Sequence, residues 1–480
     1  MKLARLFSGP MAVYLWAAVV LSPVSLAFGQ AESSEQAVDP AWQSEPMSLN
    51  YQPQTAQEQQ EPAEEVVSET TTETVTEAPA YDIWTTKRLT GDWGGARTWM
   101  DDHGIDFSAI YVGVWQQNFR GGLNTHNADD FNGDLRLNLR LDLDKMGVVP
   151  GGFFFIRGKS SYNDSVQREV GSLGSTSWVM ASGDHEFFLD KWWYGQYFFE
   201  KKLEFRIGKL LTPVDLFDCN AYAQSPWDQF INAHMCANPT FPHRKAPGAF
   251  LKYTPCDYFY FQMAGVNADQ RDSTRGVSFD TTFHNKYGGD NPYFIGMFEM
   301  GFTPKLSSAN GAMPGNYRLG WWYDPRPGTV FRDNLGGILS DRTHGSDVGF
   351  YASFDQMLCK ENDDAKDKQG LGTFFRYGFA HRDINAISNF WSLGAQYQGL
   401  IPRRDNDVLA FGVAQSIMSS QLRHEVNNLA DRETVYELYY AIHITPAIVL
   451  TPDIQVITNP GGNKDARDAL VGSLRVKISL

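Results

Sequence analysis

The stretch Asp134-Leu-Arg-Leu-Asn-Leu-Arg-Leu-Asp-Leu-Asp144 decides the fold class of this 480-residue chain. Its leucines occupy every second position, and charged or amide side chains fill the positions between them. Side chains alternate between the two faces of a β-strand, so this pattern puts all the leucines on one face. A helix would instead spread them around its axis. The stretch therefore predicts a strand with one apolar and one polar face.

The same two-faced pattern recurs from Ile105 onwards. Ile105–Phe119 places aromatic residues on one side, and Leu203–Lys209 and Tyr436–Ile444 alternate apolar with charged residues. The closing stretch sets Leu474, Val476, Ile478 and Leu480 against Ser473, Arg475, Lys477 and Ser479. Many of these runs have about ten residues, the length that a tilted strand needs to cross a bilayer. A soluble sandwich strand with buried leucines would show the same alternation.

Composition and connections favour a membrane barrel. Aromatic residues make up 14% of the chain and glycines number 43, while the mean hydropathy is −0.36. This combination suits a wall with one apolar face, aromatic girdles and a polar interior. Tight turns such as Pro150-Gly151-Gly152 and long polar loops such as Asp164–Gly183 and Cys359–Gly370 fit its two unlike rims. At roughly 25 residues per strand and loop, residues 105–480 are predicted to form an all-β, transmembrane antiparallel β-barrel of about 16 strands.

The first 80 residues are predicted to lie outside the barrel. Lys2 and Arg5 precede an apolar stretch that ends at Leu21, so residues 1–30 are predicted to be a secretory signal peptide. The alternative, a membrane anchor, needs about 20 apolar residues. Residues 31–80 hold eleven Asp or Glu and no Lys or Arg, against a net charge of −15 for the whole chain. They are predicted to be a disordered acidic linker, with a periplasmic spacer or cell-wall tether as the alternative.

Residues 81–104 are the predicted lead-in to the barrel. Thr90 or Asp92 is suited to cap a short helix that ends at His103, with Gly104 after it. We expect this helix to pack at the periplasmic mouth or inside the barrel entrance as a plug. The alternative is a structured lead-in to the first strand.

Three stretches of the chain contain motifs that occur in a fixed order along the sequence. They are Leu89-Thr-Gly-Asp-Trp-Gly-Gly-Ala-Arg97 with Gly104-Ile105, then Gly208-Lys209 with Pro213-Val-Asp-Leu-Phe-Asp218, and finally Glu437-Leu-Tyr-Tyr440, Thr451-Pro-Asp-Ile-Gln455 and Asn459-Pro-Gly-Gly462. In order and spacing they resemble the OprB-type carbohydrate-selective outer-membrane porin family. The resemblance implies a 16-stranded barrel in the cell outer membrane through which small sugars diffuse passively. A general non-selective porin and a secreted all-β glycan-binding or glycan-acting protein are the alternatives.

The polar strand faces supply the candidate functional residues. By alternation, the predicted pore-lining residues are Asp134, Arg136, Asn138, Arg140, Glu204, Arg206, Glu437, Asp453, Gln455, Arg475 and Lys477. Their mixed signs argue against a strongly anion- or cation-selective channel. For each of them, simple solvation of the inner wall is the alternative. The irregular segment Pro226–Pro247 is predicted to be an extracellular or inward-folding loop that narrows the pore.

The cysteines and the search for catalytic motifs indicate neither a metal site nor an enzyme. Among Cys219, Cys236, Cys256 and Cys359, a disulfide between the first two is predicted for an oxidising compartment, with free buried cysteines as the alternative. No CxxC pair or tetrahedral Cys/His spacing appears, so we expect no metal and no other cofactor. No HExxH, GxSxG or P-loop motif appears, so an enzyme is not expected.

The expected partners follow from the barrel. They are small sugars as solutes, outer-membrane lipid, and the barrel-assembly machinery, which usually recognises a terminal aromatic where Leu480 stands. Self-association into a homo-oligomer is left open, and no nucleic-acid partner is expected.

Overall fold

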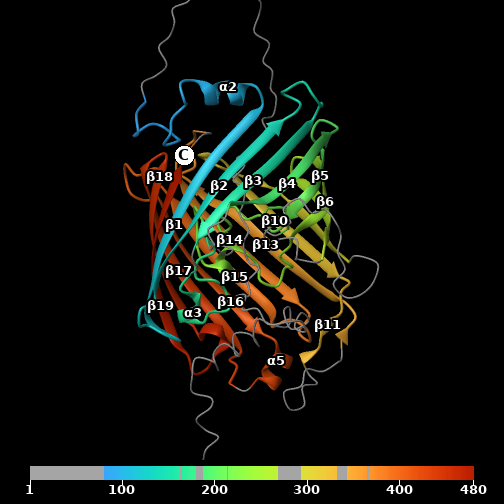
Figure 1. The fold of residues 1–480 in the computed structure, drawn as a ribbon, viewed down its shortest axis with the longest axis vertical. Helices are drawn as coiled ribbons and strands as arrows, with labels where there is room; N and C mark the ends of the chain where they lie inside the picture. Colours follow the sequence, from blue (N-terminus) through green and yellow to red (C-terminus); the bar gives the residue numbers. More distant parts are fainter. Residues whose placement is uncertain are drawn as a thin grey trace, which may run out of the picture.

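The computed structural model describes residues 81–162, 165–179, 187–212, 215–268, 293–331, 343–364, 367–426 and 428–480. The signal peptide and acidic linker predicted for residues 1–80 lie outside the described residues. Within them, 16 strands close into one antiparallel barrel (Figure 1). Each wall strand pairs with the next one along the chain, and β19 pairs with β1 to close the ring. The predicted fold class and strand number are confirmed.

The wall strands mostly span nine to fourteen residues. The first eight are β1 (Ile105–Gly122), β2 (Asp129–Asp142), β3 (Gly152–Tyr162), β4 (Phe187–Phe198), β5 (Leu203–Leu211), β6 (Lys245–Cys256), β7 (Phe259–Asn267) and β8 (Phe294–Phe302). The others are β10 (Gly311–Asp324), β13 (Asp347–Lys360), β14 (Gly370–Ala380), β15 (Ile387–Gln398), β16 (Val408–Met418), β17 (Arg432–Thr445), β18 (Ile448–Thr458) and β19 (Arg467–Ser479).

The remaining elements are short. Strand β9 (Lys305–Ser308) pairs with β10, and β11 (Gly328–Thr329) pairs with β12 (Thr343–His344) in a separate two-stranded sheet. The helices are α2 (Ala96–Asp102), α3 (Gln167–Val170), α4 (Ala233–Cys236), α5 (Ser420–Glu425) and the 3₁₀ turn η4 (Pro460–Gly462). No helix of the described residues is long and apolar enough to cross a membrane.

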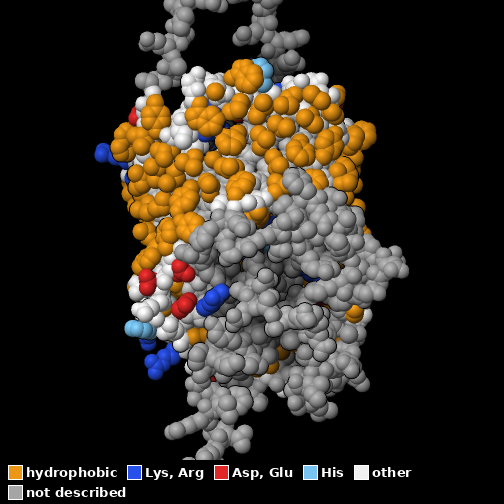
Figure 2. Space-filling model, viewed as in Figure 1, with side chains coloured by type: hydrophobic (Ala, Val, Ile, Leu, Met, Phe, Trp, Pro, Cys, Tyr) orange, Lys and Arg blue, Asp and Glu red, His pale blue; other side chains and the backbone are white. Residues whose placement is uncertain are grey.

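The alternation in the sequence gives each strand an outer and an inner face. In β1, Trp115 and Phe119 are 38% and 53% exposed, whereas the intervening Gln116 is buried. The predicted strand Asp134–Asp144 lies in β2 except for its last two residues. The amides of both donate to the Gly152 carbonyl and so begin the turn to β3. The apolar faces thus form the outer wall, and hydrophobic side chains cover the upper part of the molecule in Figure 2.

The two rims of the barrel differ. Short turns join β2 to β3, β4 to β5, β6 to β7 and β17 to β18 on the upper rim of Figure 1. The connections from β3 to β4 and from β5 to β6 leave the opposite rim and are longer. Membrane barrels have short periplasmic turns, so the upper rim is the periplasmic one. The loop predicted over Cys359–Gly370 is shorter than expected, because β13 runs to Lys360 and β14 begins at Gly370, and it lies on the short-turn rim.

The predicted N-terminal helix is present as α2 on this periplasmic rim (Figure 1). The Asp92 carboxylate accepts a hydrogen bond from the Thr98 amide at 2.9 Å, so Asp92 satisfies an amide of the first turn. Gly95 precedes the helix with φ 93° and Gly104 follows it with φ 81°. Both values favour glycine, and they fix the helix at these ends.

Candidate functional site in the barrel interior

All the predicted pore-lining residues lie on the inner faces of their strands. Asp134, Arg136 and Arg475 are buried in the interior, and Glu437 and Gln455 are fully buried there. Asn138, Arg140, Glu204, Arg206 and Lys477 are only half-buried and lie nearer the periplasmic rim. The difference arises because a loop fills the deeper half of the interior. Contact of these residues with a solute stays a prediction.

The segment 215–244, between β5 and β6, folds into the barrel. It includes most of the stretch Pro226–Pro247, for which the sequence left an extracellular or an inward-folding loop open. Its backbone and side chains bond to strands on the far side of the ring, β14 and β17 to β19 among them. The structure therefore shows an inward loop, and we call residues 215–244 the inward loop below.

Arg376 of β14 holds the inward loop at three points. Its fully buried guanidinium donates to the Asp218 carboxylate at 2.9 Å and to the carbonyls of Ala223 and Met235 at 2.5 and 2.9 Å. Hydrogen bonds to charged groups are about twice as strong as neutral ones. One side chain thus fixes both the start and the short helix of the loop.

Glu299 of β8 holds the start of the same loop. It accepts hydrogen bonds from the Asp218 amide, from the hydroxyls of Tyr260 and Tyr351, and from the Gln262 amide, at 2.5 to 2.8 Å. A buried carboxylate needs several such donors to offset the loss of hydration. Glu299 and Arg376 were not among the predicted residues. The available signal was a lone charge on an inner face made otherwise of apolar residues and glycines, as in β8 and β14.

Several predicted pore residues serve as further anchors of the loop. Glu437 accepts from the amides of Ile231 and Asn232, and Gln455 accepts from the Asn232 side chain at 2.9 Å. Arg475 donates to the carbonyls of Pro226 and Gln229 at 2.5 and 2.7 Å. Lys477 pairs with Asp228 of the loop, and Arg136 lies 2.8 Å from the centre of the Trp227 ring. These side chains therefore position the loop.

Apolar packing completes the attachment. Phe230 meets Phe374 and Tyr439 edge to face, with ring centres 5.7 and 5.0 Å apart. The inner face of β16 is made mostly of small residues, and a Cβ at Gly412 would clash with the Met235 methyl. The loop thus lies in a hollow lined by small side chains.

A second segment, residues 165–179, lies beside the inward loop. The Trp178 amide donates to the Ile231 carbonyl at 2.6 Å, and the Ala233 amide donates to the Ser175 carbonyl at 2.9 Å. Glu433 of β17 accepts from the Leu173 amide at 2.9 Å. The two segments are hydrogen-bonded to each other and together narrow the interior of the barrel.

The inner faces of β2 to β6 carry basic side chains in ion pairs. Arg136 and Lys159 lie 2.5 and 3.4 Å from the Asp134 carboxylate. Lys191 pairs with Asp215 of the inward loop, and Lys245 pairs with Asp190. Burying a charge is costly, and such pairing with an opposite charge offsets much of that cost.

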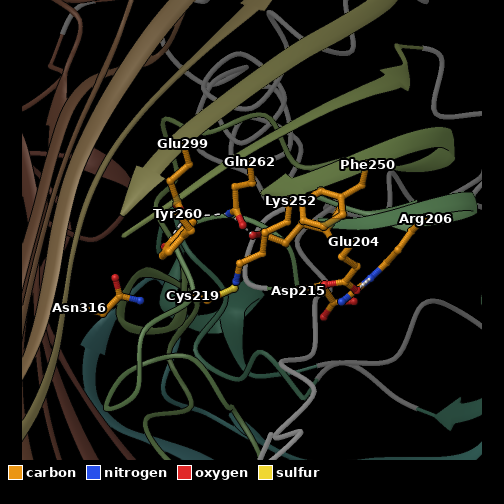
Figure 3. A pocket seen from close by; sticks show the side chains of 11 residues that line it. Glu204, Arg206, Asp215, Cys219, Phe250, Lys252, Tyr260, Gln262, Glu299 and Asn316 are labelled. Atoms are coloured by element: carbon orange, nitrogen blue, oxygen red, sulfur yellow. Dashed lines mark hydrogen bonds and ion pairs between the residues drawn. The ribbon is translucent and has the colours of Figure 1, made fainter. Parts of the chain in front are cut away.

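A small pocket remains between the inward loop and the wall on the periplasmic side (Figure 3). It has a volume of about 120 Å³ and is lined by Glu204, Arg206, Asp215, Leu216, Cys219, Phe250, Lys252, Tyr260, Gln262, Glu299 and Asn316. Arg206 donates to Glu204 at 2.5 Å and lies 5.4 Å from the centre of the Phe250 ring. The Lys252 ammonium lies 4.4 Å from the centre of the Tyr260 ring. The pocket thus combines fixed hydrogen-bonding charges with aromatic faces.

The predicted disulfide between Cys219 and Cys236 is not formed in the structure. Cys236 lies in the short helix α4, and its buried thiol donates to the Phe230 carbonyl at 3.0 Å. Cys219 instead lines the periplasmic pocket. The inward loop thus takes the two residues to different parts of the interior.

The histidine near these cysteines is also a structural residue. His234 is buried beside Ser416, with 3.2 Å between its Nδ1 and the hydroxyl oxygen. Burial lowers the pKa of His234 to about 4, so its ring is neutral at neutral pH. In the described residues no group of His, Cys, Asp and Glu side chains is arranged to hold a metal ion.

A closed 16-stranded barrel with an apolar outer wall, a polar interior and an inward loop defines an outer-membrane porin. The model of the carbohydrate-selective porin, OprB family matches residues 126–480, and the chain belongs to this family. It is an outer-membrane porin for carbohydrates, as the resemblance implied.

Two relatives support this assignment. Porin B of Pseudomonas aeruginosa is 25% identical over 426 residues, which cover 82% of this chain and 91% of that protein. The high-pH structure of Pseudomonas putida OprB superposes with a TM-score of 0.72 at 23% identity and covers 83% of this chain and 99% of that one. The second match shows that the two barrels share one fold.

Proposed function

We propose that carbohydrates diffuse passively between the inward loop and the inner wall and make a selective contact in the pocket of Figure 3. The observation that carries this proposal is the pairing of Arg206 and Glu204 beside the rings of Phe250 and Tyr260. Sugars offer hydroxyls around a partly apolar ring. Charged donors and acceptors match the hydroxyls, and an aromatic face matches the ring.

A sugar must bind in the pocket weakly enough to leave it again. A channel must bind a solute well enough to admit it and weakly enough to let it leave. Arg206 and Glu204 already satisfy each other, so a sugar hydroxyl replaces part of an existing hydrogen bond. The net gain is then small, about 1 kcal/mol for a typical hydrogen bond.

The test compares Arg206→Met with wild type in liposome-swelling assays on sugars, amino acids and salts of similar size. The sugar rate is expected to fall by up to about tenfold relative to the salt rate, because about 1.4 kcal/mol corresponds to tenfold. Arg432→Met is the control, since Arg432 is half exposed at the opposite rim. An unchanged sugar-to-salt ratio in Arg206→Met would remove the pocket from the mechanism. Equal rates for all solutes in wild type would indicate a non-selective pore.

The N-terminal and assembly features are also proposals. We propose that residues 1–30 are a signal peptide that is cleaved on export and that residues 31–80 serve as an acidic linker. N-terminal sequencing and protease digestion of the mature protein would test both. The barrel-assembly machinery inserts the chain, and self-association is tested by crosslinking in native membranes. Passive diffusion requires no catalytic step, so no enzymatic activity is proposed.

A further inference from the structure

The lead-in residues 81–103 present large apolar side chains to the outside of the molecule. Trp84, Trp93 and Trp99 are 67%, 47% and 56% exposed, and Tyr81 and Ile83 are exposed as well. An apolar group of this size on a surface marks a place of contact with another phase or molecule. Neither the barrel nor the pore accounts for it.

Hydrogen bonds fix this segment along the edge of the wall. The Leu89 amide donates to the Ser479 carbonyl at 2.7 Å, and Arg97 donates to the Leu480 carbonyl at 3.1 Å. At the other end, the Lys145 ammonium in the turn from β2 to β3 donates to the Asp101 carbonyl at 2.6 Å. These contacts lie at the periplasmic ends of β19 and β2, the two neighbours of β1. The segment therefore follows the rim over adjacent strands, and α2 does not enter the barrel.

The exposed rings continue the lipid-facing wall. The Trp93 ring lies 5.9 Å from the ring of Phe107, which is on the outer face of β1, and Arg97 stacks over Trp93 at 3.9 Å. Other aromatics ring the same rim, with Phe199 75% exposed and Tyr258 58% exposed. In Figure 2 the hydrophobic surface extends upwards to the rim that carries α2.

We infer that residues 81–103 form a membrane-interface anchor whose tryptophans lie among the phospholipid headgroups of the periplasmic leaflet. Tryptophan is enriched at this depth because its ring is apolar and its N–H is polar. The anchor extends the contact with the membrane beyond the barrel wall, at the point where β1 and β19 close the ring. It does not depend on which solute the pore admits.

The test places a nitroxide label at Trp99→Cys in the full protein, with Cys219, Cys256 and Cys359 replaced by serine and the protein in phosphatidylcholine–phosphatidylglycerol vesicles. Electron paramagnetic resonance then compares collisions with oxygen, which dissolves in lipid, and with a water-soluble nickel chelate. Phe131→Cys on the outer wall is the lipid control. Asp405→Cys, at an exposed position in the turn from β15 to β16, is the aqueous control.

The expected result is an oxygen-to-nickel collision ratio at residue 99 several-fold above that at residue 405 and nearer to that at residue 131. A ratio equal to that at residue 405 would place α2 in water and overturn the inference. Spin–spin broadening at residue 99 would also overturn it, because that signal assigns the surface to a second copy of the chain. Heat-modifiable mobility on a gel confirms that each labelled variant is folded. Repeating the measurement with Trp84→Cys guards against a local effect of one substitution.

Discussion

At the scale of single residues, we expect Arg376 to contribute strongly to holding the inward loop, and so to keeping the interior narrow. Its guanidinium bonds three separated points of the inward loop. Arg376→Met leaves the Asp218 carboxylate buried without its cation, which costs about 3–5 kcal/mol. We expect a lower thermal midpoint of unfolding and a larger, noisier single-channel conductance in planar bilayers.

The control for this prediction is Arg432→Met, because Arg432 also pairs with an aspartate but is half exposed. Exposed ion pairs contribute only about 0–1 kcal/mol, so its conductance and midpoint should match those of wild type. Arg376→Lys should fall between the two, since one ammonium cannot reach three acceptors in the same geometry. Wild-type conductance in Arg376→Met would show that the other anchors hold the loop without it.

Asp407, in the turn from β15 to β16, gives a pH-dependent prediction. Burial opposes its charge, but hydrogen bonds from Arg404, Tyr440 and the His443 amide outweigh burial and lower the pKa of Asp407. A lowered folded-state pKa gives stability that is complete above the unfolded value of about 3.9 and is lost as the pH falls through the folded value. Asp407→Asn should therefore cost about 1–3 kcal/mol at pH 7.

Thermal unfolding of wild type and Asp407→Asn across pH 2–7 tests this expectation. The difference between their midpoints should be constant near neutrality and shrink once the pH is below about 3.9. Asp405→Asn, exposed in the same turn, should show no difference at any pH. A difference that persists unchanged to the lowest pH would mean that Asp407 acts through packing and not through its charge.

At the scale of elements, strand β16 shows how the wall accommodates the loop. Its inner face presents Ala410, Gly412, Ala414 and Ser416, against which α4 packs. Gly412→Leu should displace Met235 and Phe230 and destabilise the protein by about 1–3 kcal/mol through overpacking. Val413→Leu, one residue along and facing lipid, is the matched control and should leave the thermal midpoint unchanged. Equal effects of the two substitutions would show that the loop can move without cost.

The same strand shows which elements the sequence can and cannot predict. β2 and β19 could be identified because polar inner residues alternate with apolar outer ones. β16 lacks that contrast, since its inner face consists mainly of small residues against which α4 packs. In the same way, Glu437 and Arg475 could be assigned to an inner face by alternation. Their bonds to the loop depend on which segment fills the interior, and alternation carries no information on that.

At the scale of the whole molecule, closure of the ring means that every wall strand is held by two neighbours and is expected to unfold together with them. All 16 strands of the described barrel have two hydrogen-bonded neighbours, so no strand edge is left open. We expect the unheated protein in sodium dodecyl sulfate to migrate as a compact species and to change mobility only after boiling. Extraction should require detergent, because the outer wall is apolar. Release into buffer without detergent would contradict the membrane location.

The anchors of the inward loop impose an order on assembly. Arg376 lies 158 positions after Asp218 in the chain, and Arg475 lies 249 positions after Pro226. The loop leaves β5, and several of the side chains that bind it, Arg376, Glu437 and Arg475 among them, are on β14 and the closing strands. The contacts of the loop to these strands form only once the strands themselves are in place. We therefore expect a barrel that lacks its closing strands to hold the inward loop less firmly, so that the width of this passage is set late in biogenesis.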